Sequence, residues 1–70
     1  MPEIQATMAG TIADILVKEN DSVQAGQDVV ILESMKMHIP IQSNHDGTVK
    51  EITIKQGDFV NTGHVLIKLE

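Results

Sequence analysis

Residues 33–40, ESMKMHIP, contain the clearest candidate for chemistry in this chain, a single lysine between two methionines. The amine of Lys36 is a potential nucleophile, but a free lysine amine is almost wholly protonated at neutral pH. Its activation requires a base or a desolvating pocket, and the flanking Met35 and Met37 supply no base. The sequence therefore indicates an amine on which an outside enzyme acts, and the alternative is an ordinary solvated lysine.

Other polar residues form no recognisable catalytic or metal-binding pattern. His38, His45 and His64 match no zinc spacing and fall in different segments, so we expect them on the surface. Glu19 and Asp21 have no nucleophile or base beside them, and the chain has no phosphate-binding loop and no nucleophile elbow. We therefore predict no catalytic residues, no metal ligands, and a protein that is not an enzyme by itself.

Composition argues against several classes of partner. Ten acidic residues against five basic ones give a formal charge of −5, and Phe59 is the single aromatic residue. Nucleic-acid binding needs cationic side chains for phosphates and aromatic ones for stacking, so no such partner is expected. Crossing a membrane takes about 20 apolar residues, and the N-terminus lacks the pattern of a secretory signal. We therefore expect no membrane partner and a cytoplasmic location.

The chain contains two copies of one unit. Residues 1–33 align with residues 38–70 at an offset of 37 without a gap, and eleven positions are identical. This agreement is too extensive for chance and predicts one domain, residues 1–70, with an internal repeat. The identical positions of the first copy are Ile4, Gln5, Gly10, Thr11, Ile15, Lys18, Asp21, Val23, Gly26, Leu32 and Glu33.

Each copy has the pattern of short β-strands separated by tight turns. β-Branched residues dominate the segments between the glycines, and no window has a helical period. Asn20 aligns with Gly57 in the repeat, and both residues tolerate the left-handed backbone of a tight turn. We predict an all-β fold, a flattened eight-stranded barrel or sandwich of two four-stranded sheets with a pseudo-twofold axis, known as a barrel-sandwich hybrid. Phe59, opposite Ser22, is predicted to anchor the core.

Only residues 34–37 fall outside the two copies, and this is the length of a tight hairpin. Lys36 would then lie on the hairpin between the fourth and fifth strands. Two-residue hairpin turns favour Asn-Gly, because their φ angles are positive, so Met35-Lys36 breaks the local rule. The repeat maps this hairpin onto the gap between the chain ends, which we expect at the opposite end of the molecule.

The whole chain resembles the biotinyl/lipoyl attachment family, and most closely the biotin carboxyl carrier domains and small biotin/lipoyl attachment proteins. The resemblance rests on MAGTI at 8–12, ESMKM at 33–37, DGTV at 46–49 and GDFVNTGHVLIKLE at 57–70. It implies that a biotin protein ligase attaches biotin covalently to Lys36. The biotin arm would then carry a carboxyl group from a biotin carboxylase to a carboxyltransferase. The first copy aligns with the second without a gap, so it lacks the "thumb" insertion of some acetyl-CoA carboxylase carriers.

The resemblance also leaves alternatives open. Glu33, Ser34, Met35 and Met37 would be recognised by the ligase, although either methionine could instead fill a gap in the core. The second interpretation is a lipoyl carrier of a 2-oxoacid dehydrogenase or glycine cleavage type system, with lipoate on Lys36. Lipoyl domains carry Asp before this lysine and Ala after it, so the two methionines favour biotin. The third interpretation is a docking module with an unmodified lysine. We expect the isolated domain to be a monomer.

Overall fold

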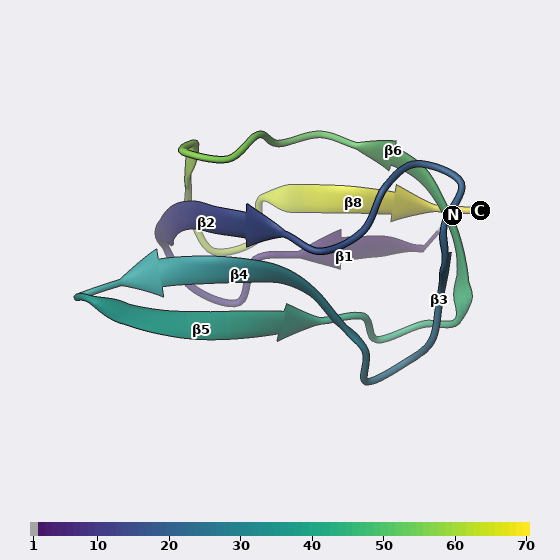
Figure 1. The fold of residues 1–70 in the computed structure, drawn as a ribbon, viewed down its shortest axis with the longest axis horizontal. Coiled ribbons are helices and arrows are strands. Elements are labelled where there is room, and N and C mark those ends of the chain that lie inside the picture. Colours follow the sequence, from purple (N-terminus) through teal and green to yellow (C-terminus); the bar gives the residue numbers. More distant parts are fainter. Residues whose placement is uncertain (1) are drawn as a thin grey trace.

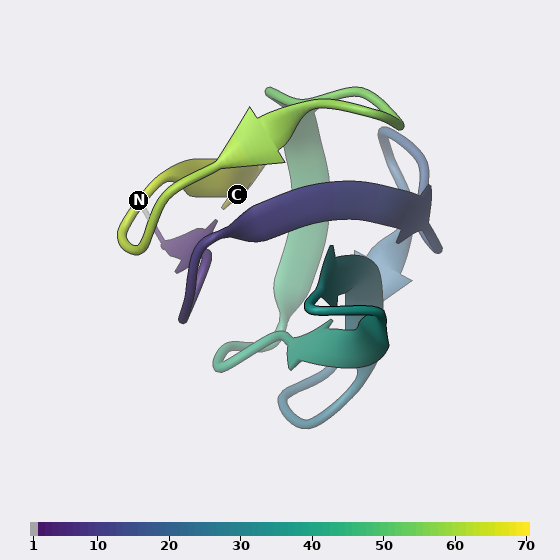
Figure 2. The same cartoon turned by 90° about the vertical axis from the view of Figure 1, so that its left-hand side faces the viewer.

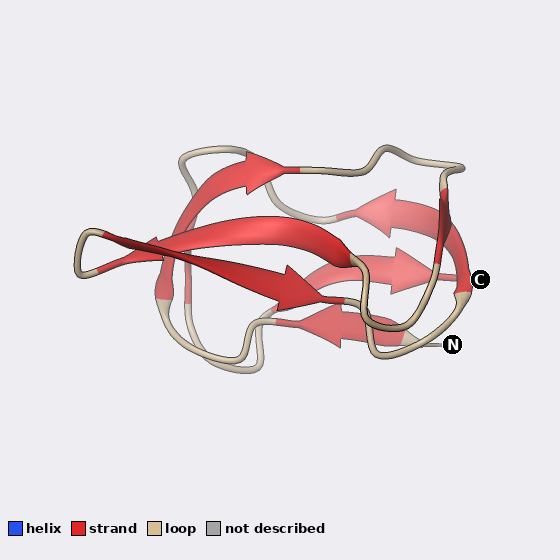
Figure 3. Cartoon of the chain, turned by 60° about the horizontal axis from the view of Figure 1, so that its bottom comes forward, coloured by secondary structure: helices blue, strands red, loops and turns tan. Residues whose placement is uncertain are grey.

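Two four-stranded antiparallel sheets pack face to face around one core. The computed structural model describes residues 2–70, and within them it contains strands and loops and no helix (Figure 3). Membrane-spanning helices are accordingly absent from residues 2–70. The strands are β1 (Glu3–Gln5), β2 (Gly10–Ile15), β3 (Ser22–Val23), β4 (Asp28–Ser34), β5 (Met37–Gln42), β6 (Gly47–Ile52), β7 (Phe59–Val60) and β8 (Val65–Leu69).

The two halves of the chain are interlocked. One sheet has the strand order β1-β8-β6-β3 and the other has the order β5-β4-β2-β7. Each sheet therefore takes its two central strands from one half of the chain and its two outer strands from the other half. An offset of 37 residues converts one strand order into the other, so the predicted eight-stranded sandwich with a pseudo-twofold axis is confirmed.

Hydrogen bonds repeat with the same symmetry. The amide of Asn20 donates to Val49 at 2.8 Å, and the amide of Gly57 donates to Ile12 at 2.8 Å. Each bond joins one half of the chain to the other. Asn20 and Gly57 have φ angles of 75° and 94°. These positive values confirm the prediction that both residues adopt the left-handed backbone of a tight turn. The carboxylate of the following aspartate accepts from the backbone amide of Lys18 or Lys55 at 2.9 Å, which closes the turn.

The core consists of aliphatic residues from both copies. Its members occupy equivalent positions in the two halves, with one difference: Ala6 in the first copy corresponds to Ser43 in the second. The hydroxyl of Ser43 is buried but satisfied, because it donates to the carbonyl of His45 at 2.6 Å. The core residues are Ile4, Ala6, Ile12, Val17, Val23, Val29, Val30, Leu32, Ile41, Val49, Ile54, Val60, Leu66, Ile67 and Leu69.

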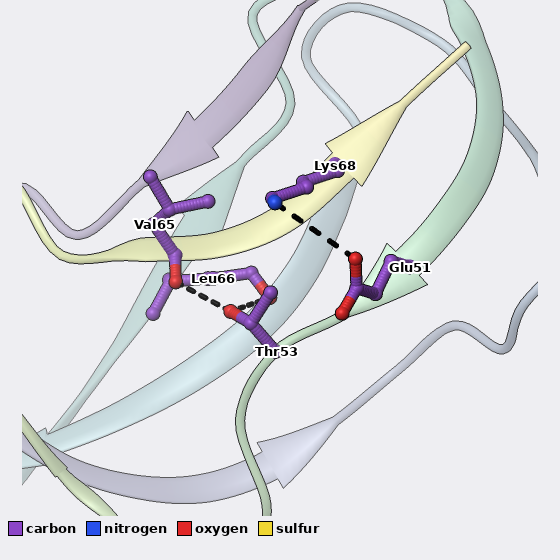
Figure 4. A network of polar contacts seen from close by, with 5 residues as sticks. All are labelled: Glu51, Thr53, Val65, Leu66 and Lys68. Carbon is purple, nitrogen blue, oxygen red and sulfur yellow. Dashed lines mark hydrogen bonds and ion pairs between the residues drawn. The ribbon is translucent and has the colours of Figure 1, made fainter.

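Side chains on the outer surface differ between the halves even where the backbone repeats. The amides of Leu16 and Thr53 donate to equivalent carbonyls, those of Val29 and Leu66. In the second half the Thr53 hydroxyl adds bonds to Val65 and Leu66 at 2.6 and 3.1 Å, and Lys68 lies 3.8 Å from Glu51 (Figure 4). Leu16 has no hydroxyl with which to form such bonds. The two outer surfaces therefore differ, although the backbone hydrogen bonds are the same in both halves.

The structure corrects the prediction for Phe59. Its side chain is 64% exposed and does not anchor the core. In the two-residue strand β7, successive side chains point to opposite faces, and Val60 at 1% exposure takes the inward position. Phe59 must therefore face outward. Pro40 lies on the edge strand β5, a position at which proline is tolerated.

Candidate functional site

The candidate site is the β4–β5 hairpin, which projects from one end of the molecule (Figure 1). Ser34 pairs with Met37, so Met35 and Lys36 are the two residues of the turn. Their φ angles are 53° and 65°, the left-handed values that a two-residue hairpin turn needs at both positions. The predicted conflict with turn preferences is therefore real, and each such residue costs about 1–2 kcal/mol relative to an ordinary conformation.

Packing below the turn holds the hairpin in place. Leu32 is fully buried, and Gly10 of β2 passes so close to β4 that an added Cβ would lie 2.8 Å from the Glu33 carbonyl oxygen. Gly47 approaches Glu70 in the same way in the other half, at 3.0 Å. The close approach of β2 therefore fixes the strand that leads into the turn.

Lys36 presents its amine to solvent. It is exposed, and within residues 2–70 no hydrogen bond or ion pair involves its side chain. Met35 is 92% exposed and Met37 is 64% exposed. Neither methionine therefore fills a gap in the core, and both side chains lie on the surface of the hairpin. The hairpin thus offers a free primary amine between two polarizable apolar side chains.

The remaining residues predicted for recognition lie just behind the turn. Glu33 is exposed and its carboxylate lies 3.6 Å from Nε2 of His38, its cross-strand partner. Ser34 is half-buried at the base of the turn. The structure therefore brings Glu33, Ser34, Met35 and Met37 together around Lys36.

Lys36 lies outside the polar groove of the molecule and, within residues 2–70, belongs to no metal-binding cluster. A polar groove of about 380 Å³ lies between β1 and the loop after β5, lined by residues 3–7, Gln42 and Asn44, and Lys36 is not among its lining residues. Residues 2–70 contain no group of three or more His, Cys, Asp or Glu side chains placed to hold a metal. His38, His45 and His64 are exposed, as predicted. The amine is therefore available to another protein and is not enclosed by this one.

The chain ends lie at the far end of the long axis from the hairpin. The molecule measures 32 × 19 × 18 Å, and the hairpin and the C-terminus occupy opposite ends of the long dimension (Figure 1). The amide of Leu69 donates to the Pro2 carbonyl at 2.9 Å, which holds the two ends of the described chain together. This arrangement is the one that the repeat predicted.

A family model described as "Biotin-requiring enzyme" matches residues 1–69. The chain belongs to this biotin/lipoyl family. It is 63% identical over 35 residues to the methylmalonyl-CoA carboxyltransferase 1.3S subunit of Propionibacterium freudenreichii subsp. shermanii, covering 50% of this chain and 28% of that protein. It is 50% identical over 38 residues to a biotin/lipoyl attachment protein of Bacillus subtilis (strain 168), covering 54% of this chain and 52% of that protein. The matched segments thus represent about half of one relative and less of the other.

Solved structures of the family have the same fold. A urea carboxylase of Kluyveromyces lactis superposes with a TM-score of 0.91 and 26% identity, over 99% of this chain and 6% of that one. A single-chain, multi-domain long-chain acyl-CoA carboxylase superposes with a TM-score of 0.86 and 27% identity, over 94% of this chain and 7% of that one. In both proteins the similar region is a small part of a large carboxylase chain.

Proposed function

We propose that this protein is a biotin carboxyl carrier whose biotin is attached to Lys36. The observation that carries the proposal is the exposed amine of Lys36, which lies at the apex of a projecting hairpin and has no hydrogen bond or ion pair within residues 2–70. Membership of the biotin/lipoyl family supports it, as do the relatives named for carboxyltransferase and biotin attachment. The protein contributes no catalytic group of its own and is the substrate and carrier for other enzymes.

Loading is an acyl transfer carried out by a biotin protein ligase. The amine of Lys36 gives up a proton and its nitrogen attacks the acyl carbon of biotinyl adenylate. The bond from that carbon to the phosphate oxygen breaks, AMP leaves, and an amide forms. No carboxylate or imidazole of residues 2–70 forms a hydrogen bond or ion pair with Lys36, so we assign removal of the proton to the ligase. The rigid hairpin contributes by holding the amine clear of the body of the protein.

When attached, biotin supplies a ring nitrogen that carries a carboxyl group. The lysine side chain and the biotin tail together form a flexible arm of about 10–15 Å, judged from about ten single bonds. Such a tether raises the effective concentration at each partner site to the millimolar range. The partners we propose are a biotin carboxylase, which loads the carboxyl group, and a carboxyltransferase, which removes it.

Lipoate is the competing group, because the Bacillus relative is named for both attachments. The exposed methionines favour biotin, since lipoyl domains carry Asp and Ala at these places. Intact-mass measurement decides between them: the purified protein is incubated with ATP and either biotin plus biotin protein ligase or lipoate plus lipoate ligase. We expect one biotinyl group to be added and Lys36→Arg to abolish the gain. Gain of a lipoyl group alone would replace this proposal with the lipoyl carrier, and no gain would overturn both.

A further inference from the structure

The two halves of the chain have matching cores but one unmatched exposed aromatic side chain. Phe59 and its counterpart Ser22 are both exposed, and each pairs with an equivalent threonine, Thr11 or Thr48. The fold therefore accepts a serine at this position. A single exposed apolar side chain is ordinary on a protein surface, so Phe59 indicates a binding surface only through its position near the two exposed methionines of the hairpin.

Phe59 lies on the same surface and at the same end as the hairpin. It pairs with Thr11, Thr11 pairs with Glu33, and Glu33 pairs with His38, so these side chains form one row across β7, β2, β4 and β5. Neighbouring strands are about 4.8 Å apart, which places Phe59 about 10 Å from Glu33 along the row. In Figure 2, viewed from the hairpin end, β2 crosses between the hairpin and β7, whereas β3 with Ser22 lies at the end with the termini (Figure 1).

The reach of Lys36 indicates which partner covers this row. An unloaded lysine extends only about 6 Å from the backbone, so the enzyme that acylates it must seat directly on the hairpin. The biotin carboxylase and the carboxyltransferase act on an arm that is about 10–15 Å long. They can therefore reach its end without contacting the body of the carrier. A specific protein contact buries about 800 Å² on each partner, equivalent to a disc of about 16 Å radius. A ligase centred on the hairpin therefore also covers Phe59.

We propose that Phe59 is a docking contact for the biotin protein ligase and sets the affinity of the ligase for this carrier. The inference rests on the proposed function. Phe59 enters an apolar pocket of the ligase, and the rim of that pocket carries cationic side chains opposite Glu33. The formal charge of −5 favours approach of such a basic surface. The phenyl ring acts in binding and takes no part in the acyl transfer.

The test compares biotinylation kinetics of Phe59→Ser, which installs the residue of the other half, with those of Leu16→Thr. Leu16 is also an exposed apolar residue, at 47% exposure, and Thr53 is its counterpart. We expect Phe59→Ser to raise the KM of the ligase for the carrier about tenfold, as for an interface anchor, with kcat unchanged. Leu16→Thr should stay within about twofold of wild type, and Phe59→Leu should restore most of the affinity. Circular dichroism verifies that each variant is folded.

Each outcome bears on a separate statement. If wild type is loaded on Lys36 and Phe59→Ser is loaded with the same KM, the docking inference is wrong and the carrier function stands. Normal loading of Phe59→Ser with slow carboxylation by biotin carboxylase would assign the contact to that enzyme and overturn the ligase assignment. If wild type accepts no biotin, the proposed function fails and the inference fails with it.

Discussion

Lys36 differs from the other lysines in where the backbone places it. Lys18 and Lys55 begin tight turns closed by aspartates, and Lys68 lies 3.8 Å from Glu51. Lys36 occupies the apex of a hairpin with φ of 65°, and its amine has no hydrogen bond or ion pair within residues 2–70. Its position on the hairpin therefore distinguishes it from the other four lysines.

The flanking methionines are predicted to act in ligase recognition and not in folding. Met35→Asp combined with Met37→Ala should lower kcat/KM for biotin loading about tenfold or more, because two exposed apolar contacts are lost and a charge is introduced. The free energy of unfolding should not fall, because both methionines are exposed and aspartate adopts the left-handed φ of position 35 more readily than methionine. Urea denaturation and ligase kinetics measure the two effects. An unchanged loading rate would show that the ligase does not recognise the methionines.

At the scale of the element, the hairpin carries local strain that the two-residue turn requires. Met35→Asn should stabilise the protein by about 1 kcal/mol, because asparagine adopts a left-handed φ more readily than methionine. Chemical denaturation measures this gain. The same variant should load biotin more slowly, since one apolar contact for the ligase is removed. A loss of stability would mean that the Met35 side chain supports the turn.

The base of the hairpin depends on a glycine for a different reason. Gly10→Ala would place a Cβ 2.8 Å from the Glu33 carbonyl oxygen, and neither backbone can move freely there. We expect a loss of about 1–3 kcal/mol from overpacking, with slower biotin loading because β4 shifts. Gly26→Ala serves as the comparison. Nothing lies within 4 Å of its added Cβ, so its φ of 88° alone should reduce stability while loading is unaffected once the protein is folded.

The sequence predicted the hairpin well because the repeat isolates it. With residues 34–37 left between two copies, the length of the turn, its positive φ angles and the position of Lys36 followed. Phe59 was assigned wrongly because hydrophobicity was given more weight than register. Val60 is identical to Val23 and Ser22 is polar, so the repeat already indicated that position 59 faces outward. No local feature of the sequence indicates that the outer strands are exchanged between the two sheets, because this exchange depends on long-range packing.

For the whole molecule, the separation of the hairpin from the chain ends has a functional consequence. A protein domain fused after Glu70 lies at the opposite end of a 32 Å molecule from Lys36. The rate of biotin loading should therefore stay within about twofold of that of the unfused protein, because the fusion lies outside a ligase footprint of about 16 Å radius. Ligase kinetics on the fusion measure this. A much slower rate, with folding intact, would place the ligase contact near the termini.

The small core makes the scaffold sensitive to a single buried substitution. Leu66 is fully buried, and Leu66→Ala should cost about 2–5 kcal/mol. A chain of 70 residues has a total stability of about 4–10 kcal/mol on the usual scale per residue. Thermal unfolding should therefore shift to a much lower temperature, whereas Met35→Ala should leave it unchanged. Equal shifts would contradict the exposure that separates these two residues.

The most direct test of the account is to locate the biotin after enzymatic loading of the wild-type protein. The protein is incubated with biotin protein ligase, biotin and ATP, digested, and mapped by tandem mass spectrometry. We predict one biotinyl group on Lys36 and none on Lys18, Lys50, Lys55 or Lys68. Biotin on any of those four lysines in place of Lys36, or a protein that stays unmodified, would contradict the central claim.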